Sequence, residues 1–222
     1  MSIAISRIAV RNRDSFFLCL GTPMRYDRAA RPGDHDPRPD EVSIVQMKEL
    51  RRVVTGVDAA GKSSVEIDGP GAGIVEEGGA GLAEIWVTDA TPADNAVKGD
   101  AAKWKMRLEP PAGGSVCRFF MLAPENKTLS ARELEERTAA MFAAIGGAHC
   151  RVDTQRHPSM HTTRTIDYVI LLSGRVTLLL DKGEVDLKPF DVVVQRGTNH
   201  GWVNRGTEPA LFAAVLIDAK PL

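Results

Sequence analysis

Residues 157–204 read HPSMHTTRTIDYVILLSGRVTLLLDKGEVDLKPFDVVVQRGTNHGWVN, and they hold three of the five histidines of the chain. Of these, His161 and His200 each lie in a polar cluster at one end of an apolar, β-type run. Between the runs, Asp181-Lys182-Gly183-Glu184 is typical of a tight turn. A series of hairpins that returns one histidine towards another can build an inward-facing site in a small β-barrel. The stretch therefore predicts a site formed by His161 and His200.

The composition favours one globular domain with an additional segment. The 222 residues are 43% hydrophobic, which is enough for a substantial core, and the formal net charge is −1. A charge near zero argues against nucleic acid as the main partner, and no apolar run reaches the roughly 18 residues needed to cross a bilayer. Cys19, Cys117 and Cys150 are widely spaced, with no C-x-x-C motif. We interpret them as reduced thiols of a cytoplasmic protein rather than as disulfide or metal ligands.

Residues 1–44 differ from the remainder of the chain. They are rich in Arg, Asp and Pro and have no sustained hydrophobic periodicity, which predicts a flexible N-terminal extension. Because Arg7, Arg11 and Arg13 precede any dense acidic run, a mitochondrial-type presequence stays open as an alternative. A start codon assigned too far upstream is a third explanation. Residues 45–222 are predicted to form the folded domain.

Short apolar runs separated by turn residues dominate this domain and predict an all-β sandwich or barrel. One helix is predicted over 130–145, because Ser130 and Glu133 form a capping-box pattern and Gly146-Gly147 follows. We expect this helix to flank the sheet, and we expect the Gly-rich segment 69–81 to be a loop. The predicted strands are 50–57, 65–67, 84–88, 105–109, 116–122, 168–172, 176–180, 185–187, 192–194 and 211–217.

The polar clusters at the strand ends suggest a metal site. Alternate residues of a strand share a face, so Thr163 should point the same way as His161, and Trp202 the same way as His200. Asp167 begins the next apolar run, and a bend before it could bring its carboxylate beside His161. Two imidazoles and one carboxylate with open positions form the facial triad of non-haem iron sites, and zinc or manganese also bind such ligands. The predicted metal ligands are therefore His161, His200 and Asp167.

The same window resembles the two signature motifs of the cupin superfamily. The first family motif is G-x5-H-x-H-x3,4-E-x6-G, and here His161-x-Thr163-x3-Asp167-x6-Gly174 keeps the spacing, the first His and the last Gly. The second is G-x5-P-x-G-x2-H-x3-N, and Gly197, His200 and Asn204 follow it. In the second motif, Phe190 stands for the first Gly and Gln195 for the Pro, with one residue fewer between them. The resemblance is specific over 157–204 and looser over 45–220.

The resemblance implies a jelly-roll barrel with a site in its mouth and, by analogy, a homodimer. It also implies a small-molecule ligand, either for an enzyme or for a binding protein without turnover. The first hypothesis is a metal-dependent oxidoreductase, of the dioxygenase type, or a lyase, acting on a small organic acid or aromatic compound. The second is a metal-free binding or sensing module, which Thr163 favours because a hydroxyl replaces the second histidine of the family. No membrane or nucleic-acid partner is expected.

Five residues are candidates for binding the substrate. Thr163 and Gln195 would orient a polar ligand, while Trp202 could line the pocket or belong to the core. Tyr168 and Arg118 are further candidates for the pocket wall, although Arg118 could also face the exterior. Asp167 could be a buried carboxylate bonded to backbone amides or to Arg164 instead of a metal ligand. The sequence does not identify a catalytic residue. It also does not decide whether a metal binds, or whether that metal is iron, manganese or zinc.

Overall fold

The computed structural model describes residues 46–222, which belong to the second of two compact units, Ser43–Leu222. The predictions made for the N-terminal extension lie outside the described residues. The described part is mainly β-structure with one α-helix, which confirms the predicted fold class. No helix within it is long and apolar enough to span a membrane.

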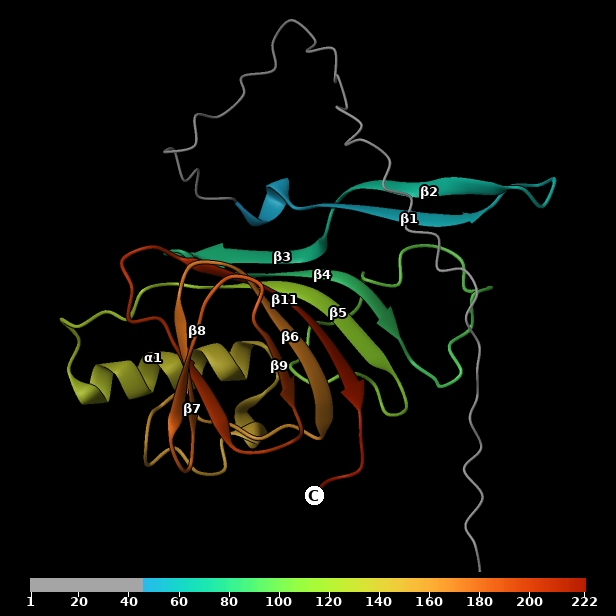
Figure 1. The fold of residues 1–222 in the computed structure, drawn as a ribbon. Helices are drawn as coiled ribbons and strands as arrows, with labels where there is room; N and C mark the ends of the chain where they lie inside the picture. The colour runs from blue at the N-terminus through green and yellow to red at the C-terminus, as the bar shows by residue number, and fades with distance from the viewer. Residues whose placement is uncertain (1–45) are drawn as a thin grey trace, which may run out of the picture. The chain divides into compact units, whose positions relative to one another are not determined.

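A six-stranded antiparallel sheet forms the larger layer of the fold (Figure 1). Its inner face is apolar because inward residues alternate with outward ones along each strand, as in β6, where Thr165, Asp167, Val169 and Leu171 are buried. The strands, in their order across the sheet, are β3 (Ala72–Glu77), β4 (Ala80–Thr88), β5 (Ser115–Leu122), β11 (Ala210–Asp218), β6 (Thr165–Ser173) and β9 (Val192–Gln195).

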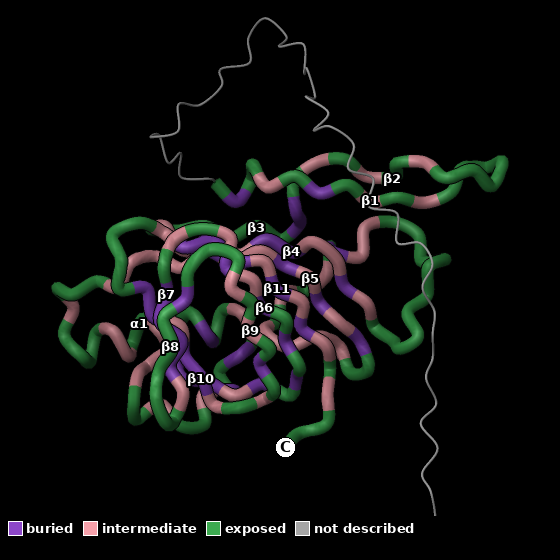
Figure 2. The backbone as a smooth tube through the Cα atoms, viewed as in Figure 1, coloured by how far each residue is buried: buried purple, intermediate pink, exposed green. Residues whose placement is uncertain are grey.

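A second sheet of three strands packs against the first and closes the core (Figure 2). The two layers share one apolar cluster, in which Leu178 of the small sheet lies with Leu171 and Phe212 of the large one. Burying a large apolar side chain in this way contributes about 1.5–3 kcal/mol. The strands, in order across the sheet, are β10 (His200–Val203), β7 (Val176–Leu180) and β8 (Glu184–Leu187).

The N-terminal strands of the described part differ from expectation. β1 (Arg51–Val57) and β2 (Ser63–Pro70) pair only with each other in a two-stranded sheet, so the predicted strands 50–57 and 65–67 do not join the sheets of the barrel. The Gly-rich segment predicted as a loop contains β3, which pairs with β4, and Gly78 and Gly79, both with positive φ, form the turn between the two strands. Conversely, 105–109, predicted as a strand, has no strand structure.

Helix α1 (Ala131–Ala144) confirms the predicted helix and its start. The Ser130 hydroxyl accepts the Glu133 amide N–H at 3.3 Å, and the Glu133 carboxylate accepts the Ser130 N–H at 2.8 Å. Phe142 is its one buried side chain, whereas the neighbouring Met141 is 47% exposed. The helix therefore flanks the sheets through a narrow contact.

Two turns show why the cupin-like motif has glycine at fixed places. Gly174 has φ 84°, and a Cβ atom there would come within 2.8 Å of the Ala210 Cα. Phe190, which stands where the family motif has Gly, adopts φ 73° and is exposed. A left-handed backbone is unfavourable for a bulky residue, so the turn between β8 and β9 holds Phe190 in a strained conformation.

Candidate functional site

The structure brings His161 and His200 together. His200 begins β10, and the two residues form an isolated antiparallel bridge, with N–H···O distances of 2.8 and 2.9 Å. Their ring centroids lie 4.2 Å apart, and both residues are buried. The adjacency follows from the hairpins between them, which return the chain to the strand position opposite His161.

The hydrogen bonds of the two rings define which nitrogen is available. His161 Nδ1 lies 2.8 Å from the Ser159 carbonyl oxygen, and His200 Nδ1 lies 2.9 Å from the Thr198 carbonyl oxygen. A carbonyl can only accept, so Nδ1 carries the proton in both rings and Nε2 keeps its lone pair. Metal-binding histidines are commonly oriented in this way, through a second ring nitrogen that donates to a backbone carbonyl.

Burial also keeps both rings neutral. Desolvation lowers the pKa of His161. Desolvation, followed by the neighbouring His161, lowers the pKa of His200 to about 3. Both imidazoles are therefore uncharged near pH 7, which is the form that binds a metal ion or accepts a proton from a ligand.

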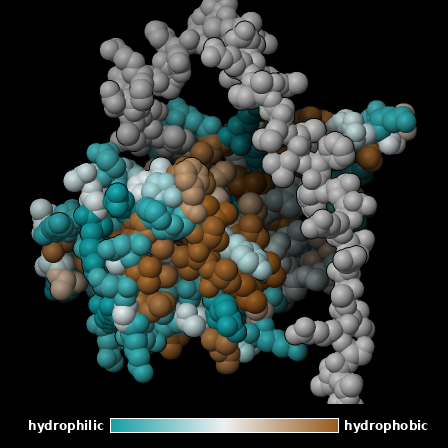
Figure 3. Space-filling model, viewed as in Figure 1, coloured by the Kyte–Doolittle hydropathy of each residue, from teal (hydrophilic) through white to brown (hydrophobic). Residues whose placement is uncertain are grey.

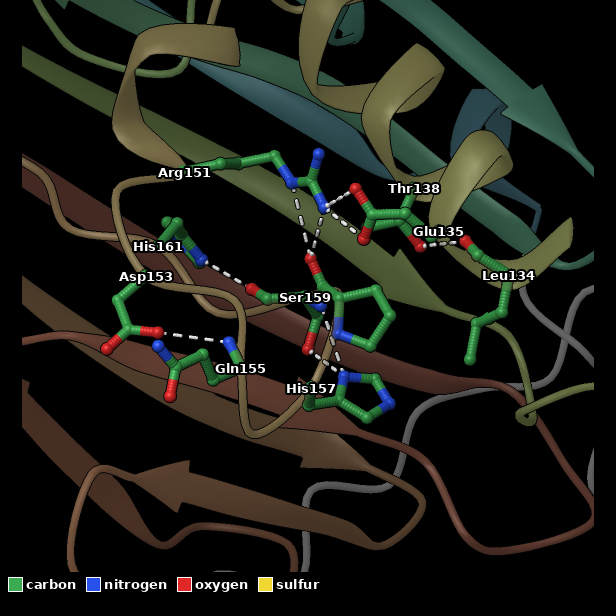
Figure 4. A network of polar contacts seen from close by, with 10 residues as sticks. Leu134, Glu135, Thr138, Arg151, Asp153, Gln155, His157, Ser159 and His161 are labelled. Carbon is green, nitrogen blue, oxygen red and sulfur yellow. Dashed lines mark hydrogen bonds and ion pairs between the residues drawn. The ribbon is translucent and has the colours of Figure 1, made fainter. Parts of the chain in front are cut away.

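A polar network holds the segment that carries His161 (Figure 4). Arg151 donates from Nη2 to both carboxylate oxygens of Glu135 on α1, at 2.8 and 2.7 Å, and to the Pro158 carbonyl at 3.0 Å. His157 contacts the Ser159 hydroxyl at 2.7 Å through Nδ1 and Glu125 at 2.8 Å through Nε2. His157 is thus occupied by structural contacts, and Arg151 is a positioning residue for the segment.

Aromatic rings surround the histidine pair. Phe142 of α1 lies 4.9 Å from the His161 ring, and Trp202 of β10 lies 5.7 Å from the His200 ring, measured between centroids. Trp202 also packs on Phe212 and belongs to the main core cluster, as its core interpretation predicted. Each histidine of the pair therefore has an aromatic neighbour on one side.

Asp167 is a buried carboxylate of β6. It is 5% exposed on the inner face of β6, and its register partner on β9 is Gln195. The described residues contain one group of three possible ligand atoms within 4.8 Å of one another, and that group does not include His161, His200 or Asp167. Asp167 Oδ1 is buried without a hydrogen-bond partner. Desolvation raises the pKa of Asp167 to about 6, although Thr165 and Arg118 act in the opposite direction.

Asp167→Asn is expected to stabilise the protein at pH 7. The pKa of this carboxyl group is about 3.9 in the unfolded chain and about 6 in the folded protein. The contribution of the carboxyl group to stability is therefore fully present below about pH 3.9, and it is lost as the pH rises through about 6. The variant avoids that loss, so its free energy of unfolding should exceed that of the natural protein by up to about 3 kcal/mol at pH 7 and equal it near pH 4. Urea denaturation at both pH values measures the difference.

Asp68→Asn is the matched control, because Arg51 lowers the pKa of Asp68 through a side-chain hydrogen bond. It should show no gain in stability at pH 7. A natural protein that is more stable than Asp167→Asn at pH 7 would mean that the ionised carboxylate has a partner, such as a bound cation, and would contradict the prediction.

The other polar candidates lie near the pair with their groups partly engaged. The buried Thr163 hydroxyl accepts a hydrogen bond from Thr165 Oγ1 at 2.7 Å. Gln195 donates from Nε2 to the Thr198 carbonyl at 2.9 Å. Gln195 and Thr198 border a cavity of about 300 Å³, and the same Thr198 carbonyl accepts the His200 Nδ1–H. The cavity is lined by Leu178, Leu180, Val193, Val194, Gln195, Arg196, Thr198 and Leu222.

Two predicted wall residues are corrected by the structure. Tyr168 is 45% exposed on the outer face of β6, because its neighbour Asp167 occupies the inner face. Arg118 does not face the exterior: it is 3% exposed and donates from Nη2 to Glu84 Oε1 at 2.9 Å. The guanidinium also donates to the carbonyls of Arg107 and Leu108, so it fixes the loop above the sheet.

Several residues near the site had not been identified from the sequence. Phe142, which contacts His161, lies on a helix whose apolar face was read only as a packing surface. Glu109, His149 and Cys150 form the single group of possible ligand atoms described above. The adjacent His149 and Cys150 were a usable signal, but the partner Glu109 lies 40 positions before His149, and only the fold brings it close.

A family model described as "Cupin domain" matches residues 148–217, which include the histidine pair and the strands from β6 to β10. This segment is a cupin domain. A cupin-domain-containing oxidoreductase of Hypocrea virens is 31% identical to the chain over 146 residues, covering 62% of this chain and 59% of that protein. Phomopsin biosynthesis cluster protein D of Diaporthe leptostromiformis is 49% identical over 65 residues, covering 28% and 34%.

The chain therefore covers 59% of the length of the first relative and 34% of the length of the second. Among solved structures, a Schizosaccharomyces pombe cupin domain aligns with a TM-score of 0.38 and 10% identity, covering 76% of this chain and 83% of that one. A sugar phosphate isomerase of the cupin superfamily from Silicibacter pomeroyi aligns with a TM-score of 0.33 and 17% identity, covering 63% and 59%.

Proposed function

We propose that this cupin is a metal-dependent oxidoreductase that acts on a small organic acid or aromatic compound. The observation that carries the proposal is the pair of buried, neutral imidazoles whose Nδ1 protons are held by backbone carbonyls. The proposal is also supported by relatives named cupin-domain-containing oxidoreductases from Hypocrea virens, Neurospora crassa and Aspergillus ruber.

The residues fit a metal ion in part. His161 and His200 offer two Nε2 lone pairs from neighbouring strand positions. Thr163, at the position of the second family histidine, is a neutral hydroxyl already bonded to Thr165, and Asp167 lies outside the close group. The two histidines would hold iron, manganese or zinc, and water or substrate would complete the coordination. Bound there, the metal supplies Lewis-acid polarisation of a substrate oxygen or electron transfer.

The cavity bordered by Thr198, whose carbonyl accepts the His200 Nδ1–H, suits a ligand with an apolar body and a polar end. Leu178, Leu180 and Val193 line its apolar part, whereas Gln195 and Thr198 supply polar groups. Ligand pockets commonly combine apolar walls with a few polar groups that fix orientation. In this proposal Gln195 orients the polar end of the substrate, and the aromatic side chains around His161 exclude bulk water.

Elemental analysis of protein purified without chelators tests the proposal. We expect close to one equivalent of a transition metal, or uptake of one equivalent when iron, manganese or zinc is added. Less than about a tenth of an equivalent, with no uptake on titration, would exclude the metal-dependent mechanism.

The alternative is a binding or sensing cupin that uses the same cavity without turnover. The replacement of a family ligand by Thr163, already paired with Thr165, favours this alternative. In that case the neutral histidines would hydrogen-bond the ligand directly. Ligand binding with equal affinity in the presence and absence of chelator would support it.

A homodimer and a cytoplasmic location remain predictions. Figure 3 shows apolar surface gathered over the outer face of the large sheet, where Ile166, Tyr168, Val192 and Val194 are exposed. Contiguous exposed apolar surface commonly marks a protein–protein interface, which supports association of two copies. Sedimentation equilibrium measures the mass, and a monomer at micromolar concentration would contradict the dimer.

A further inference from the structure

A second cluster of possible metal ligands lies outside the histidine pair. It consists of Glu109, in the loop before β5, and of His149 and Cys150, which belong to the short 3₁₀ helix η2 (Ala148–Cys150). One ligand atom from each residue lies within 4.8 Å of the other two. His149 Nε2 lies 2.8 Å from Glu109 Oε2 and 3.5 Å from Cys150 Sγ.

We propose that Glu109, His149 and Cys150 bind a zinc ion. Zinc takes thiolate, imidazole and carboxylate ligands at about 2.0–2.3 Å in tetrahedral geometry, which places an N and an S ligand about 3.6 Å apart. The observed 3.5 Å between His149 Nε2 and Cys150 Sγ matches this spacing. Glu109 Oε2, at 2.8 Å from the same nitrogen, would move outward by about half an ångström to coordinate.

The backbone around the cluster holds the ligands in place before any metal arrives. Glu109 Oε1 accepts the Arg164 amide N–H at 2.7 Å, which orients the carboxylate and leaves Oε2 directed at His149. The Cys150 carbonyl accepts the Thr162 amide N–H at 2.8 Å, which anchors η2 beside the strand position of the cupin histidine His161. Such second interactions orient ligands in natural metal sites.

Exposure differs among the three ligands in a way that suits a zinc site at the surface. Cys150 is 2% exposed, whereas the His149 side chain is 67% exposed. The metal can therefore be reached from the His149 side, and water can take the fourth position. On binding, the Cys150 thiol releases its proton to solvent. The His149 ring changes tautomer, so that Nδ1 rather than Nε2 carries the proton. Cys150 Sγ and His149 Nε2 then both present lone pairs to the metal.

The site ties together three segments that surround the cupin pair: the loop before β5, η2 and the start of β6. Because Arg164 and Thr162 donate their amides to Glu109 and Cys150, the ion would hold the segment between His161 and β6 without contacting substrate. The expected role is structural, and it is independent of the function proposed above. It also assigns Cys150 a role other than the free thiol expected from the sequence.

Cobalt titration of the full chain tests the site, because Co²⁺ replaces zinc and a thiolate ligand adds a near-ultraviolet charge-transfer band. We expect the band in the natural protein, its complete loss in Cys150→Ser, and at least a roughly 100-fold weaker affinity in His149→Ala, since even outer-shell changes cost 10–100-fold. His149→Ala changes an exposed side chain and should fold even if Cys150→Ser does not. Cys117→Ser is the matched control and should keep the band.

The double variant His161→Ala/His200→Ala separates this site from the cupin pair. It should keep the charge-transfer band, because neither histidine contributes sulfur. Absence of the band in the natural protein, or its persistence in Cys150→Ser, would overturn the zinc site while leaving the proposed function untouched. A band lost in Cys117→Ser would equally overturn it.

Discussion

His200→Ala is expected to abolish metal uptake at the cupin pair. The variant removes one of two Nε2 donors, and the remaining imidazole of His161 cannot hold a divalent ion alone. Loss of even an outer-shell partner costs about 10–100-fold in metal affinity, so loss of a ligand should lower uptake below detection. The measurement is metal titration in a Cys150→Ser background, which removes the second proposed site.

His157→Ala is the matched control, since His157 contacts Ser159 and Glu125 and does not join the pair. It should keep full uptake. Because His200 is 2% exposed, His200→Gln, which fills more of the space, separates a lost ligand from a lost fold. Unchanged metal content in a folded His200 variant would show that the ligand assignment is wrong.

Arg118→Met should destabilise the fold by about 3–5 kcal/mol, because it leaves the Glu84 carboxyl buried without its cation. The side chains of Arg118 and Glu84 are 3% and 1% exposed, and their contact is 2.9 Å. Desolvation raises the pKa of Glu84 and lowers that of Arg118, so burial disfavours the charged form of each. Urea denaturation measures the loss of free energy of unfolding.

A double variant and an exposed ion pair provide the controls. Glu84→Met/Arg118→Met removes both charges and should recover much of the lost stability, since two apolar side chains of similar volume replace a buried pair. Arg51→Met breaks the pair with Asp68, whose side chains are 67% and 47% exposed, and should cost far less stability than Arg118→Met because solvent screens an exposed pair. Equal losses in the Arg51 and Arg118 variants would refute this account of the buried pair.

The local pattern of the sequence was sufficient for most of the barrel strands. The predicted 176–180 coincides with β7, and the capping box placed the start of α1 at the correct residue. These features depend on neighbours a few residues apart, such as a turn beside an alternating run. Strand alternation also places Tyr168 and Asp167 on opposite faces of the sheet, so the two side chains cannot both line one pocket.

Contacts between residues far apart in the sequence could not be inferred in the same way. An arginine in an apolar strand is expected to face solvent unless a buried carboxylate pairs with it, and Glu84 lies 34 positions before Arg118. The separate β1–β2 sheet likewise depends on which strands meet in space. The burial of Asp167 is also a long-range outcome, because the inner face of β6 is covered by the second sheet.

The sequence by itself determined the positions of the strands from β6 to β9 and the two histidines that meet, because turn residues and alternation act over short distances along the chain. Only the tertiary structure decided which nitrogen of each histidine is free, and it buried the Asp167 carboxylate without a partner for Oδ1. It also brought Glu109 to His149 and Cys150. Those outcomes depend on backbone carbonyls and side chains contributed by distant segments, and no local pattern encodes their meeting.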